Sequence, residues 1–90
     1  MEFVWDRAKA AANSKKHGVT FDEACSVFLD PLSATGSDPD HSRTEERWLT
    51  FGRSSRGRLL VVSHTDNGEM IRIISARRCT ASERKLYENA

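Results

Sequence analysis

The chain has 90 residues, of which 30% are charged, and a formal net charge of +1. This composition predicts one ordered domain, residues 1–90, with a single core. Its apolar runs are far shorter than the roughly 20 residues of a membrane-spanning helix, and the charged start MEFVWDRAK does not fit a signal peptide. Two isolated cysteines, Cys25 and Cys79, do not fit a disulfide scaffold or a zinc site, so we expect a cytoplasmic protein with reduced thiols and no membrane contact.

The first predicted helix runs over residues 7–16, which are rich in Ala and Lys. Asp6 is a suitable N-cap before it, and His17-Gly18 is a suitable end, because glycine accepts the left-handed conformation wanted there. Residues 3–5 fit either a short strand or a packed lead-in.

A second helix is predicted to begin at the capping box of Thr20 and Glu23, in which each side chain can accept a hydrogen bond from the other's backbone N–H. Pro31 cannot continue this helix and restricts the residue before it, which predicts an end at Asp30. The apolar residues follow the spacing i, i+3, i+4 and i+7 of a helix face packed on a core: Phe21, Ala24, Cys25 and Phe28.

The period then changes to two and predicts a sheet. Residues 46–53, 58–65 and 69–77 fit three strands, and the short turns between them predict an antiparallel meander. Residues 32–45 begin with a possible edge strand and continue as a loop. Thr80 and Glu83 form a second capping box, which begins a last helix extending to about residue 89. The predicted fold class is therefore α+β, with two N-terminal helices, an antiparallel sheet of three to four strands and a C-terminal helix.

The last two strands each combine an apolar face with a mixed face. In residues 69–77, Ile71 and Ile73 share one face, and Arg72, Ile74, Ala76 and Arg78 share the other. In residues 58–65, Arg58, Leu60, Val62 and His64 alternate with Leu59, Val61 and Ser63. If the mixed faces of the two strands lie on the same side, the sheet exposes a basic surface made of Arg58, His64, Arg72 and Arg78. If the alternation shifts near the strand end, Arg77 takes the place of Arg78.

Charge is unevenly distributed along the chain. Residues 1–45 hold 5 Lys and Arg against 8 Asp and Glu, and residues 46–90 hold 9 against 5, so balances of −3 and +4 sum to +1. Arginine dominates the basic half, and its planar fork of donors suits phosphates and bases. A basic sheet beside Tyr87 fits RNA, which offers phosphates to cations and bases to aromatic rings. The alternative is that these arginines pair with Glu46, Glu69 and Glu83.

The order of motifs resembles the BrnT family of bacterial type II toxins, which are RelE-like ribonucleases. The resemblance covers nearly the whole chain, although single pieces such as SAR mean little alone. It rests on WD, KAAANSKKHGVTFDEACSVFLDP, DPDHSRTEER, GRSSRGRLLVV, IRIISARR and a last ER before Tyr87. It implies a compact RelE-like domain and an endoribonuclease that inhibits translation by cleaving mRNA, free or on the ribosome.

The resemblance also implies a partner. This is a BrnA-like ribbon-helix-helix antitoxin that covers the active surface in a hetero-oligomer and makes the only contact with DNA. The family's reaction implies no metal and no cofactor, since the 2′-OH of the RNA attacks the adjacent phosphate. Such a reaction needs a proton acceptor, cations at the phosphorane and a proton donor for the leaving 5′-oxygen.

Candidate catalytic residues follow from this chemistry. Arg72, Arg77 and Arg78 are candidates for stabilising the phosphorane, and His64 for moving protons, although a lone histidine beside a turn is often structural. Tyr87 fits either an aromatic that stacks on a base or a residue that packs the last helix.

Candidate RNA-binding residues lie elsewhere in the chain. Lys9, Asn13, Lys16 and His17 share one helix face, which either grips RNA or is simply solvated. Further candidates are Arg53, Arg58 and Arg84, the last of which can also pair with Glu88. Asp38, Asp40 and His41 fit turn residues better than metal ligands. A non-catalytic binding module that docks RNA or the antitoxin remains the alternative function.

Overall fold

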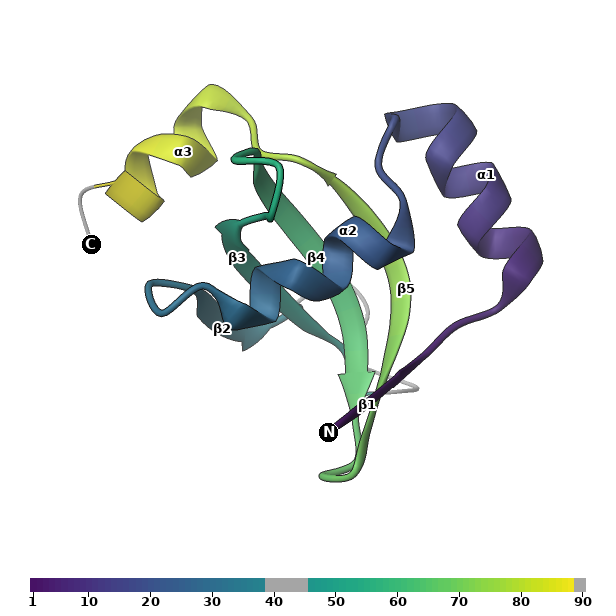
Figure 1. The fold of residues 1–90 in the computed structure, drawn as a ribbon. Coiled ribbons are helices and arrows are strands. Elements are labelled where there is room, and N and C mark those ends of the chain that lie inside the picture. Colours follow the sequence, from purple (N-terminus) through teal and green to yellow (C-terminus); the bar gives the residue numbers. More distant parts are fainter. Residues whose placement is uncertain (39–45, 89–90) are drawn as a thin grey trace.

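The computed structural model describes residues 1–38 and 46–88 and contains α-helices together with one sheet (Figure 1). The fold class is α+β, as predicted. In chain order the elements are β1 (Glu2–Val4), α1 (Arg7–His17), α2 (Phe21–Ser26), the 3₁₀ helix η1 (Val27–Leu29), β2 (Ala34–Ser37), β3 (Trp48–Arg53), β4 (Leu59–Asp66), β5 (Met70–Arg78) and α3 (Ala81–Glu88). No helix in the described ranges has the length and apolarity needed to cross a membrane.

The sheet is larger than the sequence predicted. It has five strands in the order β1-β5-β4-β3-β2, and β1 runs parallel to β5 while the other pairs are antiparallel. The predicted antiparallel meander is confirmed as β3-β4-β5, but a purely antiparallel sheet of three to four strands was wrong. The possible edge strand at the start of residues 32–45 is present as β2, and the possible short strand near the N-terminus is present as the three-residue β1.

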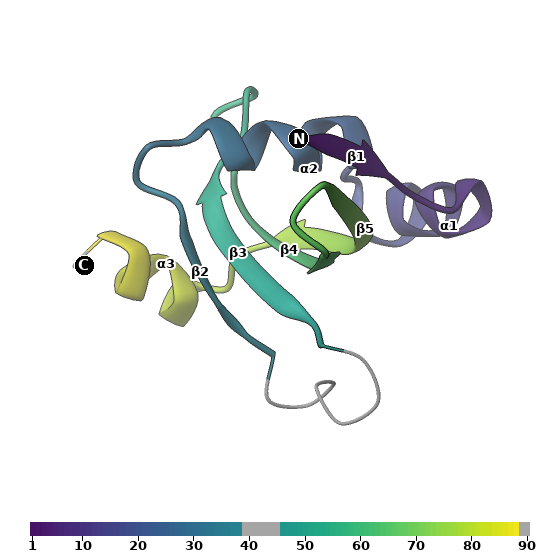
Figure 2. The same cartoon turned by 90° about the horizontal axis from the view of Figure 1, so that it is seen from below.

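Helices α2 and α3 lie on opposite sides of the sheet (Figure 2). We call the side that carries Leu60, Val62 and His64 the α2 face, and the side that carries Leu59, Val61 and Ser63 the α3 face. The main core lies between the α2 face and helix α2, and includes Phe21, Ala24 and Val27 together with residues of β4 and β5. Side-chain alternation in β4 is thus as predicted, but its mixed face is covered by α2 rather than exposed, and residues 59–64 are buried on both faces.

A β-bulge changes the alternation in β5. Ser63 pairs with Ser75 and His64 with Ile73, so Ile74 is the extra residue. The predicted grouping of Ile74 and Ala76 with Arg72 is therefore incorrect beyond the bulge, because Ala76 pairs with Val62 and is fully buried on the α2 face.

The Asn13 side chain of helix α1 bonds the backbone at the edge of β5. Among the described residues only the short β1 pairs with this edge, and the Asn13 amide bonds the backbone further along it. Asn13 Nδ2 donates to the Ala76 carbonyl at 2.9 Å, and Asn13 Oδ1 accepts from the Ala76 N–H at 3.0 Å. Nδ2 also donates to the Val19 carbonyl at 3.0 Å. Asn13, expected on a polar surface stripe, is buried and structural.

The helix ends largely follow the predicted chemistry. Asp6 caps α1, Gly18 ends it with φ of 68°, and Thr20 caps α2. The second helix is shorter than expected, because η1 replaces its last turn before Asp30. Glu23 was predicted to accept the reciprocal hydrogen bond of the capping box, but its carboxylate instead bonds Arg58 and Ser54.

Candidate functional site

Arg77 lies on the α3 face at the end of β5, where it pairs with Val61. Its guanidinium donates to both carboxylate oxygens of Glu83, at 2.8 and 2.9 Å, and to the Arg78 carbonyl at 3.3 Å. Glu83 also completes the predicted capping box with Thr80, which places it in the first turn of α3. Arg77 lowers the pKa of Glu83 to about 2, so the carboxylate stays ionised and fixes the guanidinium in orientation.

The pairing of a strand arginine with Glu83, the alternative that the sequence left open, is thus confirmed for Arg77. The pair still leaves Arg77 room for a further ligand. Three of its N–H groups are used in these bonds, and an arginine has five. The Arg77 side chain is 41% exposed. A phosphate can therefore approach the remaining N–H groups without breaking the pair.

A second group of basic residues lies beside Arg77, at the junction of α1 and β5. Lys9, Lys16 and His17 line a shallow hollow of about 230 Å³, together with Asn13, Ala12, Ile74 and Ser75. Ser75 pairs with Ser63 and so lies on the same face as Arg77, two residues away along β5. The three candidates that the helix spacing grouped thus line one hollow with Ser75, the residue two positions before Arg77 on the same face of β5.

The predicted basic sheet surface does not exist as a cluster. Arg72 shares the α3 face with Arg77, since it pairs with Thr65. Arg77 lies five positions further along the strand, which corresponds to roughly 16 Å, and Arg72 borders a pocket near the β4–β5 turn instead. Arg78 pairs with Leu60, which puts it at the exposed end of the α2 face. One phosphate cannot contact all three predicted arginines.

His64 lies in the core, which contradicts its expected place on an exposed surface. It is 2% exposed, its Nε2 bonds Thr50 Oγ1 at 2.7 Å, and its ring packs edge-on against Phe28. Burial lowers its pKa and favours the neutral ring. The prediction that His64 is exposed was wrong, because strand alternation identifies two faces but does not show which one the helices cover. In this position His64 does not reach RNA.

Arg58 and Arg53 are also held by the fold. Arg58 is on the α2 face, where it forms an ion pair with the buried carboxylate of Glu23 and donates to the Gly18 carbonyl at 3.0 Å. The hydrogen bond from Arg58 lowers the pKa of Glu23, so the pair stays charged and joins α2 to β4. Arg53 is exposed, and its guanidinium donates to the Gly57 carbonyl at 3.0 Å.

Helix α3 positions the remaining candidates. Tyr87 donates from its hydroxyl to Asp30 at 2.5 Å, and Asp30 also accepts from the backbone N–H of Arg53 at 2.8 Å. Those two hydrogen bonds, the backbone one first, lower the pKa of Asp30. Tyr87 therefore attaches α3 to the rest of the domain, which agrees with the interpretation that this residue packs the last helix. Arg84 is exposed on α3.

The described residues contain no group of three or more His, Cys, Asp and Glu side chains able to hold a metal. Asp40 and His41 lie outside the described residues. Cys25, which is partly buried in α2, has its pKa raised to about 11 by burial, and this disfavours the reactive thiolate.

Comparison with known proteins decides the family. The family model described as the ribonuclease toxin BrnT of type II toxin-antitoxin systems matches residues 5–83. The chain belongs to the BrnT family. A solved structure, the 1.1 Å crystal structure of the Brucella abortus ribonuclease toxin BrnT, is similar in fold with a TM-score of 0.66. It shares 24% sequence identity, and the alignment covers 89% of this chain and 97% of that one. A search of curated protein sequences found no match.

Membership of the BrnT family makes the chain a ribonuclease toxin of a type II toxin-antitoxin system, with RNA as substrate and an antitoxin as partner. The helix spacing in the sequence grouped Lys9, Lys16 and His17, and the structure places all three at one hollow. The sequence gave no sign that Ser75 would join them, because the packing of α1 beside β5 depends on contacts between residues far apart in the chain.

Proposed function

We propose that this BrnT-family toxin cleaves RNA without a metal at a surface formed by Lys9, Lys16, His17, Ser75 and Arg77, which we call the α1–β5 surface. The cleavage arrests growth by inhibiting translation, and a BrnA-like ribbon-helix-helix antitoxin neutralises it. The observation that carries the proposal is the hollow that gathers two lysines and a histidine beside Ser75, two residues before Arg77 on one face.

The chemistry assigns a role to each group. The 2′-OH of one nucleotide attacks the phosphate on its own 3′ side and forms a 2′,3′-cyclic phosphate, while the next nucleotide leaves with a 5′-OH. Arg77 stabilises the charge on the phosphorane, and Glu83 holds its guanidinium in place. Lys9 and Lys16 bind adjacent phosphates, which makes binding dependent on salt.

His17 is the proton-transfer group that we propose in place of His64. It lines the hollow with Ser75 and is partly exposed, whereas His64 is enclosed in the core. Histidine is the side chain that most often acts as a general acid or base.

Growth arrest on induction without the antitoxin tests this assignment. Wild type is expected to stop growth, and Arg77→Ala, Lys16→Ala and His17→Ala to relieve the arrest. Lys15→Ala is the matched control, because Lys15 is exposed on the same helix but does not line the hollow. Arrest that persists in all three variants would refute the surface. If wild type leaves growth and RNA intact, the chain is instead a non-catalytic module that binds RNA or the antitoxin.

A further inference from the structure

Strand β2 is an unprotected edge of the sheet. It pairs with β3 on one side, and among the described residues no strand lies on its other side. All four of its residues are exposed, and it contains no proline or charged side chain that would prevent a further strand from pairing.

The hydrogen-bonding pattern between β2 and β3 shows which backbone groups of β2 point away from the sheet, where a further strand could bond them. The Asp38 N–H donates to the Arg47 carbonyl at 2.9 Å, one residue beyond the last β2–β3 pair. In an antiparallel pair the bonded residues alternate, so Ala34 and Gly36 also point their backbone groups toward β3. The N–H and C=O groups of Thr35 and Ser37 therefore point away from the sheet.

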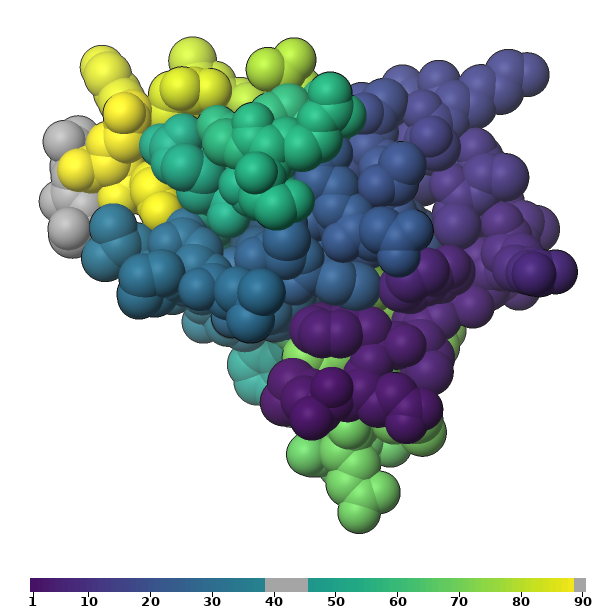
Figure 3. Space-filling model, in the orientation of Figure 1, coloured from purple at the N-terminus to yellow at the C-terminus, as the bar shows by residue number. Residues whose placement is uncertain are grey.

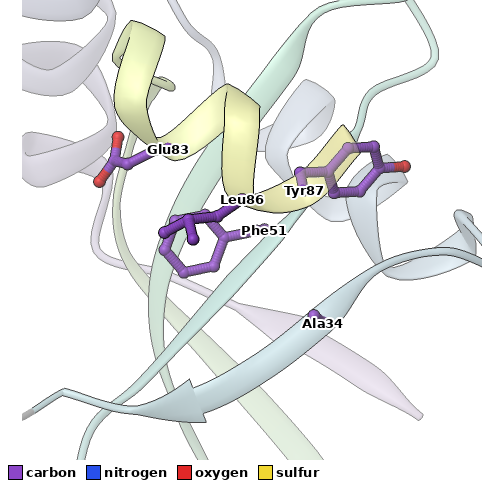
Figure 4. Close-up of a pocket in the computed structure, with 5 residues that line it drawn as sticks. All are labelled: Ala34, Phe51, Glu83, Leu86 and Tyr87. Atoms are coloured by element: carbon purple, nitrogen blue, oxygen red, sulfur yellow. The ribbon is translucent and has the colours of Figure 1, made fainter. Parts of the chain in front are cut away.

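An apolar groove adjoins this edge on the α3 face. It has a volume of about 130 Å³ and is lined by Ala34, Phe51, Glu83, Leu86 and Tyr87. Figure 4 shows Leu86 and Phe51 at its centre and Ala34 on the neighbouring strand. Leu86 is 75% exposed although it is a large apolar residue. Because Ala34 belongs to both the groove and β2, a strand added to β2 would place a side chain at the groove.

The charges at the rim indicate what kind of chain fits. Arg53 is exposed near Tyr87, since its backbone N–H and the Tyr87 hydroxyl both bond Asp30, and Arg84 is exposed on α3. The acidic residue in the groove, Glu83, is paired with Arg77. The Asp30 carboxylate is already occupied by Tyr87 and by the backbone N–H groups of Arg53 and Leu32. In a two-fold pairing of two copies through β2, both sides of the interface would carry the same arginines, whereas an acidic partner would be attracted to them.

We propose that β2 and this groove dock an extended segment of the antitoxin, which adds a sixth strand beside β2 and inserts an aliphatic side chain between Leu86 and Ala34. The segment carries acidic residues that face Arg53 and Arg84. Figure 3 shows α3 (yellow) and the chain around residues 30–37 (blue) side by side on one flank, away from α1 (purple). The docking surface is thus separate from Lys9, Lys16 and His17. This inference rests on the proposed antitoxin, but not on RNA cleavage.

Titration calorimetry with the purified cognate antitoxin tests the docking. Ser37→Pro removes an outward N–H without breaking a bond to β3, and Leu86→Asp places a charge at the groove. Each variant is expected to weaken binding at least about tenfold, the effect of losing a hydrogen bond or an apolar anchor. Ser37→Ala keeps the N–H, and Met70→Asp changes an exposed apolar residue at the start of β5, which β4 and β3 separate from β2, so both are expected to bind as wild type.

Unchanged binding by both Ser37→Pro and Leu86→Asp would overturn the proposal, as would a wild-type dimer that Ser37→Pro dissociates. RNA cleavage is measured on the same variants and is expected to match wild type. Cleavage that is absent in wild type while the binding differences hold would refute the proposed activity and leave the docking surface intact.

Discussion

Replacing Asn13 tests the attachment of α1 to the sheet most sharply. The Asn13 amide forms three hydrogen bonds: two with the peptide groups of Ala76 and one with the Val19 carbonyl. Ala76 and Val19 are both fully buried. Asn13→Ala therefore leaves one backbone N–H and two carbonyls without these partners, in a place that water does not reach.

The magnitude follows from the cost of an unsatisfied buried group. Each costs about 1–3 kcal/mol, and carbonyls tolerate the loss better than an N–H. We expect Asn13→Ala to lower the free energy of unfolding by about 3–4 kcal/mol, which is a large part of the roughly 5–13 kcal/mol typical of a domain of this size. Asn13→Asp is expected to cost at least as much, because it removes both donors and turns a carboxylate toward two carbonyls.

Urea unfolding followed by tryptophan fluorescence measures this effect, with Trp5 and Trp48 as probes. Ala12→Ser is a control beside Asn13 at an exposed position, and it should change the free energy of unfolding by less than about 0.5 kcal/mol. A loss below about 1 kcal/mol for Asn13→Ala would refute the reasoning, since the Ala76 peptide groups would then have other partners.

Three further predictions concern packing and α3. Gly52→Ala should cost about 1–3 kcal/mol of stability in the same urea assay, because its Cβ would lie 2.8 Å from Val27 Cγ1; no change would mean that the neighbour can yield. Tyr87→Phe should speed amide hydrogen exchange throughout α3 by removing the bond to Asp30, and unchanged exchange would show that this bond does not hold the helix. Since the pKa of Glu83 falls from 4.5 to about 2, its contribution is complete above pH 4.5 and is lost toward pH 2. Glu83→Gln should therefore flatten the acid dependence of stability in that window, and an unaltered pH profile would contradict this role.

The sequence predicted those elements whose signals are local. Asp6, Gly18, Thr20 and Thr80 lie at helix ends as their capping chemistry indicated, and the meander followed from its short turns. These features depend on residues within one turn of the helix or on a short connection, so no long-range contact was needed to recognise them.

What the sequence did not predict depends on contacts between distant residues. The bulge at Ile74 exists because β4 and β5 pair in a particular register, and the side of the sheet that buries His64 is set by where α2 packs. Asn13 looked like part of a polar helix stripe because its partner, Ala76, lies 63 residues away. For the site, the helix spacing grouped Lys9 with its neighbours correctly, but only the fold separates Arg72 from Arg77.

The most direct test of the central proposal is to identify the ends that the purified toxin produces on RNA in the presence of excess EDTA. Metal-independent attack by the 2′-OH predicts fragments with 2′,3′-cyclic phosphate and 5′-OH ends. The initial rate should fall at least about 100-fold in Arg77→Ala, the scale expected for losing one group that stabilises the transition state. Cleavage abolished by EDTA, fragments with 5′-phosphate ends, or full activity in Arg77→Ala would contradict the proposal.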